Sequence, residues 1–146
     1  MSTDLQATAG VVIKDFQGYP QVIASENLAT ICDPANADQF GHLDNLEQLR
    51  LAVYSANEWA RTADAIAALI PNEQENYAGE SVRLADWVEN YLDECGELSN
   101  LTDLIRNHLD FDAMWSSSFT HDFWAQEISI TDETNFVITH LIWRSF

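Results

Sequence analysis

Carboxylates are the side chains most able to do chemistry in this chain, and one close pair invites a catalytic interpretation. Asp110 and Asp112 are separated by a single residue, and paired carboxylates can act as general acid and base. Residues two apart on a helix do not face each other, however, so this pair would not converge on one substrate. No second catalytic partner follows from the spacing. The sequence therefore predicts no catalytic residue and no enzyme.

Residues that commonly bind metals or act as nucleophiles also lack the required spacing. The four histidines form no ligand motif and no Cys-x-x-Cys pair accompanies them, so no zinc site is predicted. Asp33 and Asp44 are separated like the ends of a calcium loop, but Ala35 and Ala37 occupy two ligand positions. Cys95 is a poor nucleophile candidate because neighbouring carboxylates disfavour a thiolate. We expect no metal, no cofactor, and two reduced cysteines in or near the core.

Acidic side chains dominate the whole length of the chain. There are 24 acidic and 6 basic residues among 146, which gives a net charge of −18. Charged residues make up only 21% of the sequence, below the roughly 25% of an ordinary globular protein, so basic residues are missing rather than charge added. The hydrophobic fraction of 47% is sufficient for a packed core. A folded body with this charge repels nucleic acid and anionic membranes and attracts basic protein surfaces.

One segment, 81–96, concentrates the acidity on a predicted helix that Ser81 can cap and Gly96 can end. Asp86, Glu89 and Asp93 recur at spacings of three and four, so they share one side of the helix, and Glu97 continues the line just past its end. The last of these acidic residues lie near the helix C-terminus, where a basic residue would be more favourable. A solvated polar face is one interpretation, and a binding surface is the other. The first candidates for contacts with a partner are Asp86, Glu89, Asp93, Glu94 and Glu97. The next candidates, all acidic and further along the chain, are Asp103, Asp110, Asp112 and Asp122.

The hydrophobic patterns predict an α+β protein of two modules, elongated overall. Residues 1–75 form a mainly helical module, and residues 76–146 form a smaller one in which helices pack on a short antiparallel β-sheet. The polar segment 72–76 is the expected boundary. Besides 81–96, the expected helices are 45–58, one that Thr62 or Asp64 opens and that ends at Ile70 before Pro71, 101–108 and 111–119. The expected extended segments are 11–13, 77–80 and a hairpin of 128–130 with 136–143, whereas 15–20 reads as a turn and 21–42 as mixed.

Aromatic residues are expected to serve mainly as core. Trp87 and Tyr91 lie four apart on the apolar face of 81–96, so both should be buried. Trp143 and Phe146, on the final strand, are candidates for a contact between two subunits. Four further aromatic residues should pack the last helices onto the hairpin, namely Trp115, Phe119, Phe123 and Trp124.

No apolar stretch approaches the roughly 18 residues of a membrane span. The first residues also lack the basic start and apolar run of a signal peptide. The expected location is therefore the cytoplasm.

Several short segments combine acidic, aromatic and glycine residues in a fixed order. They are Asp15-Phe16-Gln17-Gly18-Tyr19-Pro20, Tyr77-Ala78-Gly79-Glu80, the acidic helix that follows it, His108-Leu109-Asp110-Phe111-Asp112-Ala113-Met114-Trp115, Asp122-Phe123-Trp124 and Trp143-Arg144. In this order and spacing they resemble the ArdA antirestriction family. The resemblance spans 15–144 and corresponds to the middle and C-terminal thirds of a typical member. We therefore expect the family's N-terminal β-rich module to be missing.

The resemblance implies a DNA-mimic inhibitor from a phage or mobile element that acts in the cytoplasm of a bacterial host. Its implied target is the DNA-binding core of a type I restriction–modification enzyme, and its implied assembly is a homodimer formed through the C-terminal part. The same mimicry could instead act on a CRISPR effector or another DNA-binding protein. An acidic adaptor that joins proteins through its terminal strand and aromatic surface is a further alternative. In none of these cases do we expect binding to nucleic acid or membrane.

Overall fold

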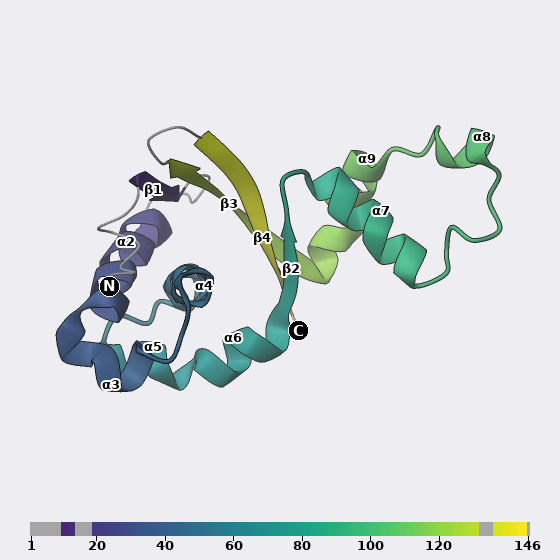
Figure 1. Ribbon diagram of the computed structural model, residues 1–146. Coiled ribbons are helices and arrows are strands. Elements are labelled where there is room, and N and C mark those ends of the chain that lie inside the picture. Colours follow the sequence, from purple (N-terminus) through teal and green to yellow (C-terminus); the bar gives the residue numbers. More distant parts are fainter. Residues whose placement is uncertain (1–9, 14–18, 132–135, 146) are drawn as a thin grey trace.

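The computed structural model describes residues 10–13, 19–131 and 136–145, and it confirms the predicted α+β class (Figure 1). In the described chain one antiparallel sheet separates two groups of helices. The strands are β1 (Gly10–Ile13), β2 (Tyr77–Ser81), β3 (Phe123–Thr131) and β4 (Phe136–Arg144). The helices are α2 (Tyr19–Cys32), α3 (Ala37–Phe40), α4 (Asn45–Asn57), α5 (Ala63–Ala68), α6 (Ile70–Asn76), α7 (Leu84–Glu94), α8 (Asp103–Arg106) and α9 (Phe111–Ser117).

The sheet has the strand order β1-β3-β4-β2, and every neighbouring pair is antiparallel. The predicted C-terminal hairpin is confirmed, although its first strand begins earlier than expected, at Phe123, which pairs with Arg144. The extended segments expected over 11–13 and 77–80 form β1 and β2, the two outer strands of the sheet. The turn predicted over 15–20 falls largely outside the described residues.

Alternating side chains of β4 contribute to two hydrophobic cores on opposite faces of the sheet. Leu141 and Trp143 join a first core formed with α2, α4 and α5, whereas Ile142 between them joins a second core formed with α7. Figure 1 shows the corresponding helix groups on opposite sides of the sheet. The module boundary predicted at residue 75 falls within the last turn of α6, and the first core contains residues from both sides of it.

Helix α4 forms where the sequence predicts a helix over 45–58, because its first turn carries a capping box. Asp44 Oδ1 accepts a hydrogen bond from the Glu47 backbone N–H at 2.8 Å, and the Glu47 carboxylate accepts one from the Asp44 N–H at 3.0 Å. Leu49 and Val53 lie on its buried face, as their spacing predicts. Local signals and core packing therefore agree for this helix.

Helix α2 is the longest helix that the sequence pattern does not predict, because the pattern over 21–42 is mixed. Pro20 lies in its first turn, where a missing N–H leaves no helical hydrogen bond unmade. The polar Asn27 interrupts the apolar pattern and yet is buried. Its side-chain amide donates to Ser55 Oγ and to the Ala60 carbonyl oxygen, both at 2.9 Å. A tertiary hydrogen-bond network therefore replaces the apolar residue that a sequence pattern requires.

Pro71 begins a helix instead of ending one, so that prediction is wrong. Helix α5 ends at Ala68 and α6 starts at Ile70, which places Pro71 in the first turn of α6. The expected boundary segment 72–76 forms the rest of α6. It is helical despite its polar sequence because Glu73 turns inward and finds partners on α4 and β4.

A buried ion pair joins these helices to the sheet. Glu73 is 2% exposed, and its two carboxylate oxygens accept hydrogen bonds from Nε and Nη2 of Arg50, each at 2.9 Å. The indole N–H of Trp143 donates to the same carboxylate at 2.8 Å. The Arg50 guanidinium also lies over the ring of Tyr77, 3.7 Å from its centroid. Burial raises the pKa of Tyr77 above its usual range, and its hydrogen bond to a carboxylate raises that pKa further, so the phenol stays neutral.

Trp143 is completely buried within one chain, so the prediction that it contacts a second subunit is wrong. Its ring stacks on Trp124 with 4.5 Å between centroids and also packs against Tyr54 and Tyr77. The physical reason is that β4 lies between β3 and β2, so its inward side chains belong to the core. Phe146, the other predicted interface residue, lies outside the described residues.

The described helices are short. The longest, α2, has 14 residues, and none in the described part of the chain has both the length and the apolar character needed to cross a bilayer. The helices predicted over 101–108 and 111–119 exist as α8 and α9 but are shorter than expected. The aromatic residues predicted to join the last helices to the hairpin do pack there, except that Trp124 faces the first core.

Replacing Glu73 by alanine should destabilise the fold strongly, because the Arg50 guanidinium would stay buried without its partner. We expect the free energy of unfolding, measured by urea titration, to fall by about 3–5 kcal/mol. Glu75→Ala is the matched control on an exposed position of the same helix, with an expected change within about 0.5 kcal/mol. The double variant Arg50→Met with Glu73→Leu should recover most of the loss. Equal losses for the Glu73 and Glu75 variants would contradict the role given to the ion pair.

Candidate functional site

The acidic helix predicted over 81–96 is α7, and aromatic side chains hold it against the sheet. Trp87 stacks on Tyr91 with 5.2 Å between ring centroids and meets Phe123 edge-on at 5.0 Å. The Trp87 indole N–H donates to the Ala78 carbonyl oxygen of β2 at 3.2 Å. The predicted core positions are confirmed, with Trp87 buried and Tyr91 partly buried. Because this face of α7 is fixed on the core, its opposite face points to solvent.

The ends of α7 differ in how well the sequence predicts them. Gly96, with a φ of +81°, follows the helix in the left-handed conformation that ends helices, as predicted. Ser81 does not cap the helix, so that prediction is wrong. It is the last residue of β2, and its hydroxyl donates to the Arg83 carbonyl oxygen at 2.7 Å. The N-cap position is occupied by Arg83, two residues later than expected for the cap.

The five first-ranked carboxylates lie on α7 or just past its end, and we call them the acidic row. Its members are Asp86, Glu89, Asp93, Glu94 and Glu97. Glu89 is half-buried and the other four are exposed. The structure thus presents to solvent the groups that the sequence nominates as contacts.

Arg106 of α8 reaches back to the acidic row, and sequence reasoning missed it. Its Nη2 and Nε atoms lie 3.1 Å and 3.2 Å from Glu89 Oε2, and its Nη1 atom lies 3.5 Å from Asp93 Oδ1. The middle of the row is therefore partly neutralised, whereas no ion pair within the described chain reaches Asp86 or Glu97. The contact joins two helices through an irregular connection, so no fixed spacing in the sequence signals it.

The second-ranked carboxylates are all exposed, and three of them support helix ends. Asp110 caps α9 by accepting a hydrogen bond from the Ala113 backbone N–H at 3.0 Å. Asp103 and Asp112 lie in the first turns of α8 and α9, where the helix dipole favours negative charge. Helix stability alone explains these three positions. Asp122 follows the last short turn before β3 and does not stabilise the start of a helix.

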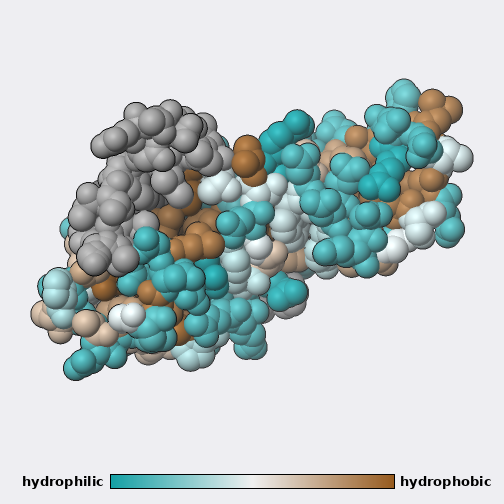
Figure 2. Space-filling view, in the orientation of Figure 1, coloured by the Kyte–Doolittle hydropathy of each residue, from teal (hydrophilic) through white to brown (hydrophobic). Residues whose placement is uncertain are grey.

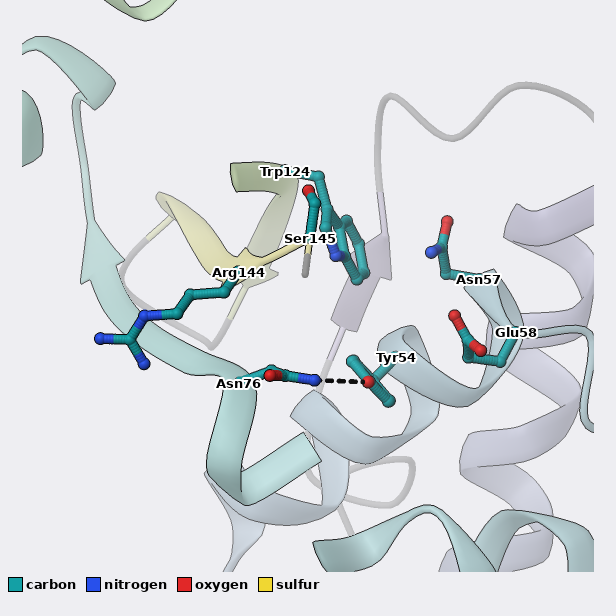
Figure 3. Close-up of a pocket in the computed structure, with 7 residues that line it drawn as sticks. All are labelled: Tyr54, Asn57, Glu58, Asn76, Trp124, Arg144 and Ser145. Atoms are coloured by element: carbon teal, nitrogen blue, oxygen red, sulfur yellow. Dashed lines mark hydrogen bonds between the residues drawn. The ribbon is translucent and has the colours of Figure 1, made fainter. Parts of the chain in front are cut away.

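A cavity of about 490 Å³ lies between α4, α6 and the paired ends of β3 and β4 (Figure 3). Within it the Asn76 side-chain amide donates to the Tyr54 hydroxyl at 3.1 Å, and Figure 3 shows the Arg144 guanidinium pointing away from Glu58. The described lining has no histidine or cysteine to serve as base or nucleophile. Its carboxylate is that of Glu58, and its hydroxyls are those of Tyr54 and Ser145. The lining residues are Tyr54, Asn57, Glu58, Asn76, Trp124, Arg144 and Ser145.

Metal-binding and thiol residues are scattered. In the part of the chain that the structure describes, no three His, Cys, Asp or Glu side chains converge as a metal site would require. Nδ1 of His140 lies 3.1 Å from the Val82 carbonyl oxygen, and Nε2 lies 3.5 Å from the Glu127 carboxylate. Cys32 is partly buried as expected, but Cys95 is exposed at the end of α7, so the expectation of a core thiol is wrong there.

Comparisons of this chain with protein-family models, with curated proteins and with solved structures find no match. The resemblance to the ArdA family therefore depends on the short segments themselves. Of these, Tyr77-Ala78-Gly79-Glu80 lies within β2 directly before the acidic helix, and Trp143-Arg144 ends β4.

Arg106→Gln should weaken the attachment of α8 to α7 in a salt-dependent way. The Arg106 side chain is 32% exposed. We therefore expect the free energy of unfolding to fall by about 0.5 kcal/mol at low salt. The loss should be smaller at about 1 M salt, where charges are screened beyond roughly 3 Å. Arg61→Gln is the control, because both partners of its pair with Glu26 are more than half exposed and no measurable change is expected. Equal losses at both salt concentrations in urea titrations would contradict an electrostatic attachment.

Proposed function

We propose that this protein is a non-enzymatic DNA mimic that occupies the DNA-binding groove of a host defence enzyme. The observation that carries the proposal is the acidic row, which a rigid aromatic core holds in an outward orientation. A groove lined with lysine and arginine attracts this row through the same long-range field that it uses for phosphates.

Helix α7 alone carries too few charges to match the phosphates of duplex DNA of the same length. An 11-residue helix is about 16 Å long, and duplex DNA of that length carries roughly ten charges. The four carboxylates within α7 supply less than half of that. Helix α9 packs beside α7 and adds Asp110 and Asp112, so the proposed surface comprises α7, α8 and α9 together. Between residues 84 and 122 the chain carries nine carboxylates and a single arginine.

The whole chain provides a consistent length scale. A net charge of −18 corresponds to about 30 Å of duplex, or roughly nine base pairs. The protein offers no base edges, so it should compete with DNA regardless of sequence. Because the attraction is between opposite charges that salt screens, binding should weaken steeply as salt rises.

The resemblance to the ArdA family favours the core of a type I restriction–modification enzyme as the target. A CRISPR effector or another DNA-binding protein has the same kind of basic groove and is the alternative target. The adaptor hypothesis is less favoured, because Trp143 of its aromatic surface is buried within the chain. We further propose action in the bacterial cytoplasm as a homodimer, without metal or cofactor.

Neutralising carboxylates of the acidic row should weaken binding more than neutralising the same number elsewhere. Both variants below change three exposed positions and the net charge equally. The test variant combines Asp86→Asn, Glu94→Gln and Glu97→Gln. The control variant combines Asp38→Asn, Glu58→Gln and Glu75→Gln. We expect each single change to weaken binding by less than about fivefold and the test variant by at least about tenfold.

The measurement is the Kd for a purified type I restriction–modification core at low salt. Equal weakening by the test and control variants would show that net charge matters and the acidic row does not. Complete loss of binding through one single change, with the fold intact, would indicate a localised hot spot in place of a distributed surface.

The protein should also capture a restriction or CRISPR component from a bacterial lysate at low salt. Because the groove of that component normally holds DNA, duplex DNA should release it from the immobilised protein, and so should added salt. Mass spectrometry of the DNA-released fraction names the target, and the test variant as bait provides the control. A captured partner that resists both DNA and salt would contradict mimicry and favour the adaptor.

A further inference from the structure

An exposed apolar patch lies at the end of the acidic helices. Leu104 is 71% exposed and Ile105 is 50% exposed, and both belong to α8. Together with His108 and Leu109 they line a surface hollow of about 490 Å³. Figure 2 shows hydrophobic side chains among hydrophilic ones at the end of the molecule where Figure 1 places α8. We call Leu104 and Ile105 the apolar tip.

The outward orientation of the apolar tip follows from the contacts of its own short helix. Arg106 faces α7, where it pairs with Glu89 and Asp93. Successive residues of an α-helix are rotated by about 100°, so Leu104 is turned by roughly 200° away from that contact. The Thr102 hydroxyl caps α8 by accepting from the Ile105 N–H at 3.3 Å. The ion pairs and the cap thus hold the leucine outward.

The apolar tip does not serve the core of this chain. None of the four residues of α8 is buried in the described structure. The second core reaches α7 and α9, and Leu98, which lies between α7 and α8 in the sequence, is buried. Exposed leucine and isoleucine side chains contribute favourable burial energy only when another surface covers them. Their position next to the proposed binding surface indicates that the covering surface belongs to the partner.

We propose that the apolar tip is an anchor that enters a hydrophobic pocket bordered by lysine or arginine on the target protein. This inference rests on the proposed DNA-mimic function and deepens it. Charge complementarity selects the occupant, because Asp103 and the acidic row flank the tip. A second copy of this chain would bring like charges together there, whereas a basic protein surface would bring opposite charges.

The anchor divides the affinity into two parts with different salt dependence. The carboxylates contribute a part that salt weakens, because it depends on charge. Leu104 and Ile105 contribute a part that salt hardly changes, because it depends on burial of apolar surface. Phosphates cannot make the second contact, so the inhibitor gains an interaction that DNA lacks.

The test is the double variant Leu104→Ser with Ile105→Ser, titrated against the purified type I restriction–modification core at several salt concentrations. We expect its Kd to be weaker by at least about tenfold at every salt concentration, with an unchanged slope of log K against log salt. Val82→Ser is the matched control, because Val82 is 61% exposed and apolar but lies outside the tip. It should bind as the unmodified chain does. Urea titration should give equal stability for the double variant and the unmodified chain, because both side chains are exposed.

Each alternative outcome identifies what fails. If the unmodified chain binds the core and the double variant binds equally well, the anchor is overturned and the mimicry stands. If the unmodified chain binds neither the core nor any DNA-binding protein from a lysate, the proposed function is overturned and the anchor with it. If sedimentation shows a dimer of this chain that the double variant loses, a second copy covers the tip and the proposal is overturned.

Discussion

The ion pair between Arg50 and Glu73 fixes the arrangement on which the rest of the structure depends. Hydrophobic burial is non-directional, whereas two parallel hydrogen bonds to one carboxylate specify both position and angle. Trp143 donates to the same carboxylate, so β4 is held in one register relative to α6. The neighbouring residue Ile142 points to the other face of the sheet and contributes to the core of α7. The orientation of the acidic helix therefore follows from a polar contact buried on the opposite face.

The aromatic core beneath α7 offsets the repulsion within the acidic row. Neighbouring carboxylates on a helix destabilise it by about 0.2–0.5 kcal/mol per pair. Aromatic pairs contribute about 0.5–1.5 kcal/mol each beyond the area they bury. Trp87 alone has ring contacts with Tyr91, Trp115, Phe119 and Phe123. Packing on one face of the helix thus exceeds repulsion on the other, and a short helix can display carboxylates that would disfavour it in isolation.

Local signals in the sequence predict the elements well, and long-range contacts explain the failures. The capping box at Asp44 and the left-handed Gly96 each depend on residues within one turn, and both predictions are confirmed. The inward Glu73, the buried Trp143 and the Arg106 contacts depend on partners many residues away, so no spacing rule identifies them. The first-ranked carboxylates lie where the sequence places them, on α7 or just past its end, and four of the five are exposed. Which partner they contact is a property of another molecule, and a single sequence carries no direct signal for it.

A DNA mimic needs both attraction to its target and selectivity for it. In this protein the acidic row would provide the attraction, and the apolar tip would provide the selectivity. An acidic surface alone would be attracted to every basic groove in the cell, including those of proteins that the host and the invading element both need. Electrostatic attraction mainly raises the association rate, whereas buried apolar contacts mainly slow dissociation. Under the proposed function, the acidic row brings the protein to any groove, and the apolar tip retains it only where a pocket accepts Leu104 and Ile105. Selectivity among grooves would then come from the contact that does not imitate DNA.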